Sequence, residues 1–171
     1  QKAISVGLAY LQPLKRKSII TILDSDGEDD SSKIAEMINC AKKNKNSIVV
    51  SCRSKRQDGI IFDMFYLIHK SITFLFTAKW INFGNYSSFN SSNLKKILKN
   101  WNSWFAYSSC VSKNCNLIKL YAERKKRFYG KSKLSFAALF LHSLRVNFIF
   151  FPRIIIFSII YILLIYSFKE Y

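Results

Sequence analysis

The C-terminal end of the chain carries the feature that most limits the fold: residues 154–168 contain no charged side chain. A helix of that length extends about 22 Å, and extension back to Phe148 brings it to the roughly 30 Å hydrocarbon core of a bilayer. Arg153 and Lys169 lie near its two ends, where long cationic side chains can reach polar headgroups. The sequence therefore predicts a transmembrane segment over 153–171, with a buried or re-entrant helix as the alternative.

Basic residues are abundant ahead of that segment. The formal net charge is +17 over 171 residues, which favours an anionic partner such as nucleic acid, an anionic membrane surface or a phosphorylated substrate. Glu123 is surrounded by a basic set: Lys113, Lys119, Arg124, Lys125, Lys126, Arg127, Lys131, Lys133 and Arg145. By the positive-inside rule, we expect the soluble part on the cytoplasmic side of a membrane.

The residues between the basic set and the transmembrane segment have one apolar face. Phe136, Leu139, Phe140 and Leu144 share that face within 134–147. The pattern predicts an interfacial helix inside a juxtamembrane segment, 134–152. An ordinary amphipathic core helix is the alternative.

The first half of the chain has an α/β pattern. Short β-branched runs at 19–23 and 47–52 predict strands, and the spacing of Ile34, Met37, Ile38 and Ala41 predicts a helix between them, capped by Ser31 or Ser32. The order strand, helix, strand favours parallel pairing of the two strands.

Further elements follow from local composition. Residues 60–77 predict a helix whose aromatic stripe, with His69 as a packed or hydrogen-bonded member, belongs to the core or a membrane surface. Residues 83–89 have the composition of a turn, 92–99 predict a helix, and 116–122 predict a strand.

Half of the acidic residues lie between Asp24 and Asp30, at the end of the first predicted strand. Their mutual repulsion is costly unless a cation offsets it. In extended geometry Asp24 and Asp26 point to one face, and two carboxylates suit Mg²⁺ or Mn²⁺ held jointly with a substrate diphosphate. The alternative is an acidic helix N-terminus, which accounts for Asp29 and Asp30 only.

The stretch 22–30 resembles the D-x-D segment of family 2 glycosyltransferases, in the dolichol-phosphate mannosyltransferase and polyprenyl-phosphate glycosyltransferase branch. Residues 3–8 resemble the helix that precedes that segment. Residues 127–133, Arg-Phe-Tyr-Gly-Lys-Ser-Lys, resemble the branch's R-x-x-G-x-S-K motif ahead of the membrane helices. The resemblance implies a partial GT-A (Rossmann-like) α/β domain over 1–133. The family's first strands have no counterpart here, so we expect a missing N-terminal portion and no activity of these residues alone.

The resemblance also implies roles for single residues. Asp26 is the main metal ligand, Asp24 lies near the ribose and the metal, and Glu28 lies near the metal or the sugar. The phosphate-binding residues implied are Arg127, Lys131 and Ser132 for the acceptor and Arg53 for the donor. Lys125 and Lys126 are expected to be ordinary lipid-facing charges.

The reaction expected is transfer of a sugar from a nucleotide-diphosphate sugar to a polyprenyl-phosphate lipid. No Q-x-x-R-W motif and no clear Glu-Asp base motif occurs in the sequence, and an acceptor phosphate is ionised near neutral pH and needs no general base. This hypothesis involves a membrane but no nucleic acid, and leaves a homo-oligomer open. The rival hypothesis is a non-enzymatic, membrane-anchored basic module that binds nucleic acid or anionic lipid through residues 124–129.

Overall fold

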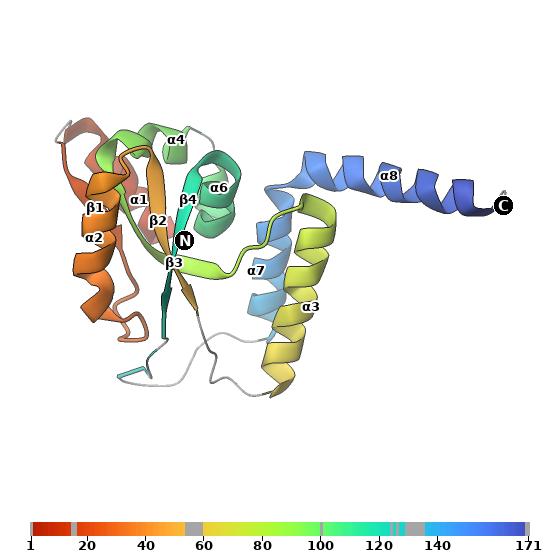
Figure 1. The fold of residues 1–171 in the computed structure, drawn as a ribbon, viewed down its shortest axis with the longest axis horizontal. Helices are drawn as coiled ribbons and strands as arrows, with labels where there is room; N and C mark the ends of the chain where they lie inside the picture. The colour runs from red at the N-terminus through yellow and green to blue at the C-terminus, as the bar shows by residue number, and fades with distance from the viewer. Residues whose placement is uncertain are drawn as a thin grey trace.

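The computed structural model describes residues 2–14, 17–53, 60–99, 101–123, 125, 127–128 and 136–169. They form a mixed α/β layer structure, with two helices beside it and a long C-terminal helix that extends away (Figure 1). The strands are β1 (Ile19–Ile22), β2 (Ser47–Arg53), β3 (Phe83–Asn90) and β4 (Asn116–Ala122). The α-helices are α1 (Lys2–Leu11), α2 (Ile34–Lys43), α3 (Ile60–Thr77), α4 (Leu94–Leu98), α5 (Asn102–Phe105), α6 (Tyr107–Asn114), α7 (Phe136–Phe148) and α8 (Phe151–Lys169).

The four strands form one sheet in the order β1-β3-β2-β4. β3 is antiparallel to both β1 and β2, and β2 is parallel to β4. β1 and β2 therefore run in the same direction, but the predicted direct pairing between them is wrong because β3 lies between them. The end of β1, β2 and β4 and the start of β3 share one edge of the sheet, where the acidic loop 24–30 begins.

The prediction of a turn at 83–89 is also wrong, because these residues form most of β3. Their serines can occupy a central strand since their hydroxyls find partners in the interior. Ser87 Oγ lies 2.8 Å from the Tyr107 hydroxyl, and Ser88 Oγ lies 2.9 Å from Thr21 Oγ1. Both serines are fully buried.

Helices cover both faces of the sheet. Met37 and Ala41 of α2 pack on Val49 and Tyr86, as the predicted inward face of this helix requires. On the other face, the alternate residues of β2 pack against helices α1, α4 and α6, in a core that includes Leu8, Ile48, Val50, Ile97, Tyr107 and Val111. The alternation of Val49 with Ile48 and Val50 is the period of a strand buried on both faces.

The capping of α2 differs from the prediction. A 3₁₀ turn, Ser31–Lys33, precedes this helix. Asp30 caps the 3₁₀ turn by accepting a hydrogen bond from the Ser32 amide. Asp30 also accepts from the Ser32 hydroxyl at 2.8 Å. A carboxylate at this position satisfies otherwise unpaired amides and complements the helix dipole.

The predicted helix at 60–77 and the predicted strand at 116–122 are confirmed as α3 and β4. α4 lies inside the helix predicted at 92–99. His69 is hydrogen-bonded as expected, with its Nδ1 atom 2.7 Å from Ser143 Oγ. The aromatic stripe of α3 is not core, however, because Phe65, Ile68 and Ile72 are exposed.

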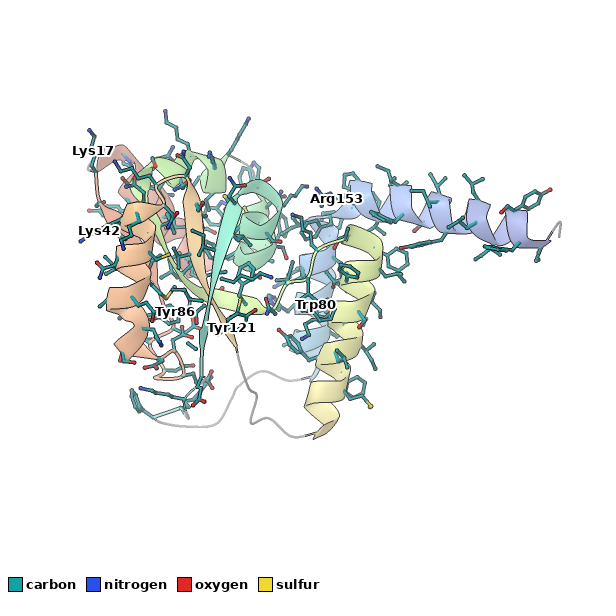
Figure 2. All side chains as sticks on the ribbon, in the orientation of Figure 1. Lys17, Lys42, Trp80, Tyr86, Tyr121 and Arg153 are labelled. Atoms are coloured by element: carbon teal, nitrogen blue, oxygen red, sulfur yellow. The ribbon has the colours of Figure 1, made fainter. Side chains whose placement is uncertain are left out.

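α8 is long and apolar enough to cross a membrane, and no residue of its most apolar stretch is buried against the rest of the described chain. Its side chains project on all sides (Figure 2). α7 lies within the predicted juxtamembrane segment. Val146 of α7 packs on Ala106, together with Ile149 and Phe150 of the turn that follows the helix. The division of the chain at residues 133 and 152 stays a prediction.

Candidate functional site at the carboxyl edge of the sheet

The acidic loop 24–30 leaves the sheet at the carboxyl end of β1, the position at which α/β sheets commonly bind ligands. β1 ends at Ile22, so Asp24 and Asp26 are not on an extended strand, and Asp26 lies in a turn. Gly27 continues this turn with a φ of +83°, a left-handed conformation that glycine adopts without steric cost. The extended geometry predicted for Asp24 and Asp26 is therefore wrong.

The segment that follows β4 lies directly against this loop. The Lys125 amide donates to the Glu28 carbonyl at 2.9 Å, and the Phe128 amide donates to the Asp26 carbonyl at 3.1 Å. The Phe128 ring covers Gly27 so closely that a Cβ atom on the glycine would collide with it. Backbone pairing and ring packing thus join two segments about a hundred residues apart in sequence.

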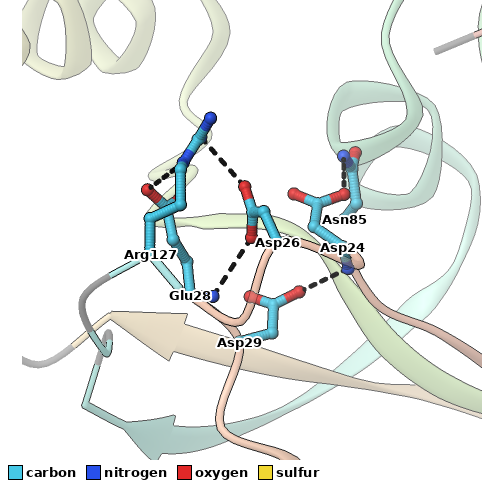
Figure 3. A network of polar contacts seen from close by, with 6 residues as sticks. All are labelled: Asp24, Asp26, Glu28, Asp29, Asn85 and Arg127. Carbon is cyan, nitrogen blue, oxygen red and sulfur yellow. Dashed lines mark hydrogen bonds and ion pairs between the residues drawn. The ribbon is translucent and has the colours of Figure 1, made fainter. Parts of the chain in front are cut away.

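Arg127 connects the side chains of these two segments (Figure 3). One terminal guanidinium nitrogen lies 2.9 Å from Asp26 Oδ2, and Nε lies 3.3 Å from Glu28 Oε1. Asp26 Oδ1 also accepts from the Glu28 amide at 3.1 Å. The arginine predicted to bind acceptor phosphate and the two acids predicted to bind metal therefore form one cluster. The three side chains are partly buried, and an ion pair near a protein surface stabilises a fold by about 1 kcal/mol or less.

Asp24 is held by different partners. Its carboxylate accepts from the Asn85 amide at 3.4 Å, and its own backbone amide donates to Asp29 Oδ2 at 2.8 Å. Asn85 comes from the start of β3, within the stretch predicted as a turn, and was not among the predicted site residues. Figure 3 shows one oxygen of the Asp24 carboxylate turned toward Asn85.

The location of Lys125 differs from the prediction. Its Nζ atom lies 2.8 Å from Asp30 Oδ1, so it contacts the acidic loop and is not an ordinary lipid-facing charge. The Lys125 ammonium, together with the Ser32 hydroxyl, lowers the pKa of the Asp30 carboxyl to about 2. Much of the repulsion within the acidic loop is thus offset by cations of the chain itself.

A small hollow opens beside the loop. It is lined by Glu28, Asp29, Asp30, Ser51, Tyr86 and Glu123, among others, and its volume of about 20 Å³ is room for little more than one water molecule. The Tyr86 hydroxyl donates to the Asp30 carbonyl at 2.9 Å. Burial, reinforced by Asp29 and Asp30, raises the pKa of Tyr86 to about 12, so the phenol stays protonated as this donor.

The donor chemistry of the loop fits Mg²⁺ or Mn²⁺, which favour carboxylate oxygens. Within the described parts of the chain, no three His, Cys, Asp or Glu side chains are grouped to hold a metal ion. An ion here would therefore take one or two carboxylates and complete its coordination with water and substrate phosphates, as Mg²⁺ often does.

The remaining predicted site residues are only partly placed. The backbone of Arg53 ends β2 at the same edge, opposite Ala122 of β4, but its side chain lies outside the described residues. Lys131 and Ser132 also lie outside them. The structure thus brings together Asp24, Asp26, Glu28 and Arg127 from the predicted set and adds Asn85 and Lys125.

The contact between Lys125 and Asp30 leads to a test of the loop geometry. Replacing Lys125 by methionine should raise the pKa of Asp30 toward the ordinary aspartate value of 3.8, because the lost ammonium no longer stabilises the carboxylate. A lowered carboxyl pKa makes the ion pair stabilising at neutral pH, and that contribution fades as the pH falls toward about 2. NMR titration of the Asp30 side-chain carboxyl in detergent micelles measures the shift. An unchanged pKa would contradict the contact, and Lys42→Met, on the far part of α2, serves as the control.

The comparisons with known proteins identify no relative: no protein-family model matches the sequence, and no curated protein or solved structure shows significant similarity to the chain.

Proposed function

We propose that this chain is part of a membrane-bound glycosyltransferase that moves a sugar from a nucleotide-diphosphate sugar to a polyprenyl-phosphate lipid. One observation carries the proposal: the acidic D-x-D loop and the arginine of the R-x-x-G-x-S-K segment meet at the carboxyl edge of the sheet, through the Arg127 contacts with Asp26 and Glu28. The two motifs have no local reason to meet, so their juxtaposition favours a shared site.

The proposed chemistry assigns a part to each group. An ionised phosphate oxygen of the lipid attacks the anomeric carbon of the sugar, the bond from that carbon to the diphosphate breaks, and the nucleoside diphosphate leaves with the electron pair. Asp26 would hold a divalent ion, which would supply Lewis-acid stabilisation of the leaving diphosphate. Arg127 orients the acceptor phosphate, and no residue has to remove a proton from an acceptor that is already ionised.

The rival hypothesis of a basic binding module is less well supported. It needs the cations of residues 124–129 to face an anionic partner. Lys125 and Arg127 instead contact Asp30, Asp26 and Glu28, so these two cations are largely neutralised within the chain. The basic character of the sequence therefore does not favour nucleic acid at this site.

Ligand binding by the full-length protein separates the two hypotheses. Titration of a nucleotide-diphosphate sugar in a calorimeter should give binding with Mn²⁺ and no measurable binding with EDTA. A single-stranded oligonucleotide in place of the sugar nucleotide is the control. Salt-sensitive binding of the oligonucleotide, with no metal-dependent binding of the sugar nucleotide, would favour the rival.

The membrane orientation is also part of the proposal, with the α/β layers on the cytoplasmic side of a bilayer crossed by α8. Native cysteines report this poorly, since Cys110 is buried and Cys115 partly so. We expect Lys42→Cys to react with an impermeant thiol reagent only after cells are opened, and Lys169→Cys to react in intact cells. The unsubstituted chain gives the background. Labelling of Lys42→Cys in intact cells would reverse the orientation.

A further inference from the structure

α3 has an inverted distribution of polar and apolar side chains. Its exposed residues between 64 and 77 cover roughly half of the helix circumference. All but Ser71 are apolar: Met64, Phe65, Leu67, Ile68, Ile72, Phe74 and Leu75. The opposite face is polar and covered, with Thr73 and Thr77 almost completely buried. A helix packed against a water-soluble domain shows the reverse arrangement.

The polar face of α3 is paired with polar residues of α7. Thr73 Oγ1 lies 3.1 Å from Asn147 Oδ1, and His69 Nδ1 lies 2.7 Å from Ser143 Oγ. Asn147 in turn donates to the Ser143 carbonyl at 3.1 Å. Helices within lipid commonly join through such small and polar side chains, because their apolar side chains gain nothing from leaving the lipid.

Lys70, the lysine of α3, lies at the border of the apolar face. Its Nζ atom lies over the rings of Tyr66 and Trp80, 4.6 and 4.9 Å from their centroids. The Trp80 ring also makes an edge contact with Phe74. Tyrosine, tryptophan and lysine in this arrangement are typical of the boundary between lipid and water.

The apolar surface of α3 continues onto α8. The rings of Phe76 and Tyr161 make an edge contact, and the Tyr161 hydroxyl donates to the Leu75 carbonyl. At the base of α8, the Arg153 guanidinium donates to the Thr77 carbonyl at 3.2 Å, at the negative end of the α3 dipole. The junction of α3 and α8, with Trp80 and Arg153 near it, is seen in Figure 2.

α7 extends the same apolar surface, and its direction relative to α8 indicates how that surface lies in a membrane. Its exposed residues are mostly apolar, with Phe140, Leu141, Leu144 and Phe148 among them, and Phe148 stacks on Phe151 of α8. In Figure 1, α3 and α7 lie side by side and α8 runs crosswise to both. Helices that run crosswise to a spanning helix lie along the membrane surface.

We propose that α3, paired with α7, lies in the surface of the bilayer that α8 crosses, with its apolar face inserted into lipid. α8 exposes apolar side chains on all sides, which lipid covers and a single protein partner does not. The apolar face of α3 is continuous with that surface, so the same occupant covers both. A helix of 18 residues extends about 27 Å and gives the domain a broad second contact with the membrane. The inference rests on α8 being in a bilayer and not on the proposed chemistry.

Photocrosslinking to lipid tests this contact in the full chain. A benzophenone amino acid is placed at Ile68 or Leu75 of α3, at Ile162 of α8 as the positive control, or at Lys42 of α2 as the negative control. All four side chains are exposed, so the substitutions leave the core intact. The protein is reconstituted in phosphatidylglycerol–phosphatidylethanolamine vesicles and irradiated, and lipid–peptide adducts are measured by mass spectrometry.

We expect adduct yields at Ile68 and Leu75 comparable with the yield at Ile162, and background at Lys42. Adducts at Ile162 alone would overturn the inference, since α8 would then be in lipid without α3. Crosslinks from Ile68 to a second copy of the chain in place of lipid would overturn it in favour of a dimer. Background at all positions would overturn the membrane placement of both helices. None of these outcomes depends on sugar transfer.

Discussion

Asp26→Asn in the full-length protein is expected to lower sugar transfer by roughly 100- to 1,000-fold, the loss typical of removing a preorganised electrostatic group. The change keeps the shape of the side chain but removes its charge. The resulting amide oxygen is a weaker ligand for a hard cation, and stabilisation of the leaving diphosphate falls with the affinity for the metal. Transfer of radiolabelled sugar to polyprenyl phosphate, at several Mn²⁺ concentrations, measures the effect.

Asp30→Asn is a matched control for this variant. It makes the same chemical change in the same loop and also removes an ion pair, the contact with Lys125. Asparagine caps helices as well as aspartate does, so the turn before α2 should persist. We expect Asp30→Asn to retain activity within a few-fold of the parent.

Asp26 also forms an ion pair with Arg127. The dependence of activity on the Mn²⁺ concentration separates this role of Asp26 from metal binding. If Asp26 holds a metal, high Mn²⁺ should restore part of the activity of Asp26→Asn, because a weakened site fills at higher concentration. If Asp26 acts only through Arg127, then Asp26→Asn and Arg127→Gln should have equal effects that Mn²⁺ does not change. Activity of Asp26→Asn within a few-fold of the parent at limiting metal would contradict a metal role.

Arg127→Lys is expected to reduce kcat/KM for polyprenyl phosphate by about 10- to 100-fold, the equivalent of the roughly 1.5–3 kcal/mol typical of a hydrogen bond to a charged group. A guanidinium has five N–H donors in a fixed plane. The Asp26 and Glu28 contacts use two of its nitrogens, so Arg127 can retain the loop and still present donors to a phosphate. A lysine ammonium is a point charge and cannot do both with the same geometry.

Lys125→Ala and Lys126→Ala are the controls, and each should change the same parameter by less than about fivefold. A charge at a membrane surface, as expected for Lys126, contributes about 1 kcal/mol. For Lys125 the structure adds a reason, since its ammonium is committed to Asp30. The loss in Arg127→Lys should appear when the lipid is the varied substrate, with little change in binding of the sugar nucleotide. If Arg127→Lys behaves like the lysine variants, the acceptor assignment is wrong, and Lys125, Arg127 and Phe128 only hold the acidic loop in place.

Local patterns were sufficient for several elements. The apolar length of 154–168, the helix at 60–77 and the strand at 116–122 follow from properties of neighbouring residues: hydrophobicity, helical spacing and β-branched or aromatic content. The inward face of α2 follows from the same periodicity. These features need no knowledge of what each segment packs against.

The role of β3 depended on tertiary structure. Gly84, Asn85, Ser87 and Ser88 have the composition of a turn, and only the pairing with β1 and β2 makes them a central strand. The hydroxyls of Ser88 and Ser87 are hydrogen-bonded to Thr21 and Tyr107, partners that are distant in sequence. The strand order follows from this pairing, and the direct β1–β2 pairing was excluded by it.

The site divides in the same way. The sequence determined that acids cluster after the first strand and that cations precede the membrane segment, because both are matters of composition. Only the tertiary structure decided that Arg127 and Lys125 turn back onto the acids and that α3 carries its apolar residues outward. Long-range ion pairs and the choice of the covered helix face depend on which surfaces meet, and a one-dimensional pattern does not contain that information.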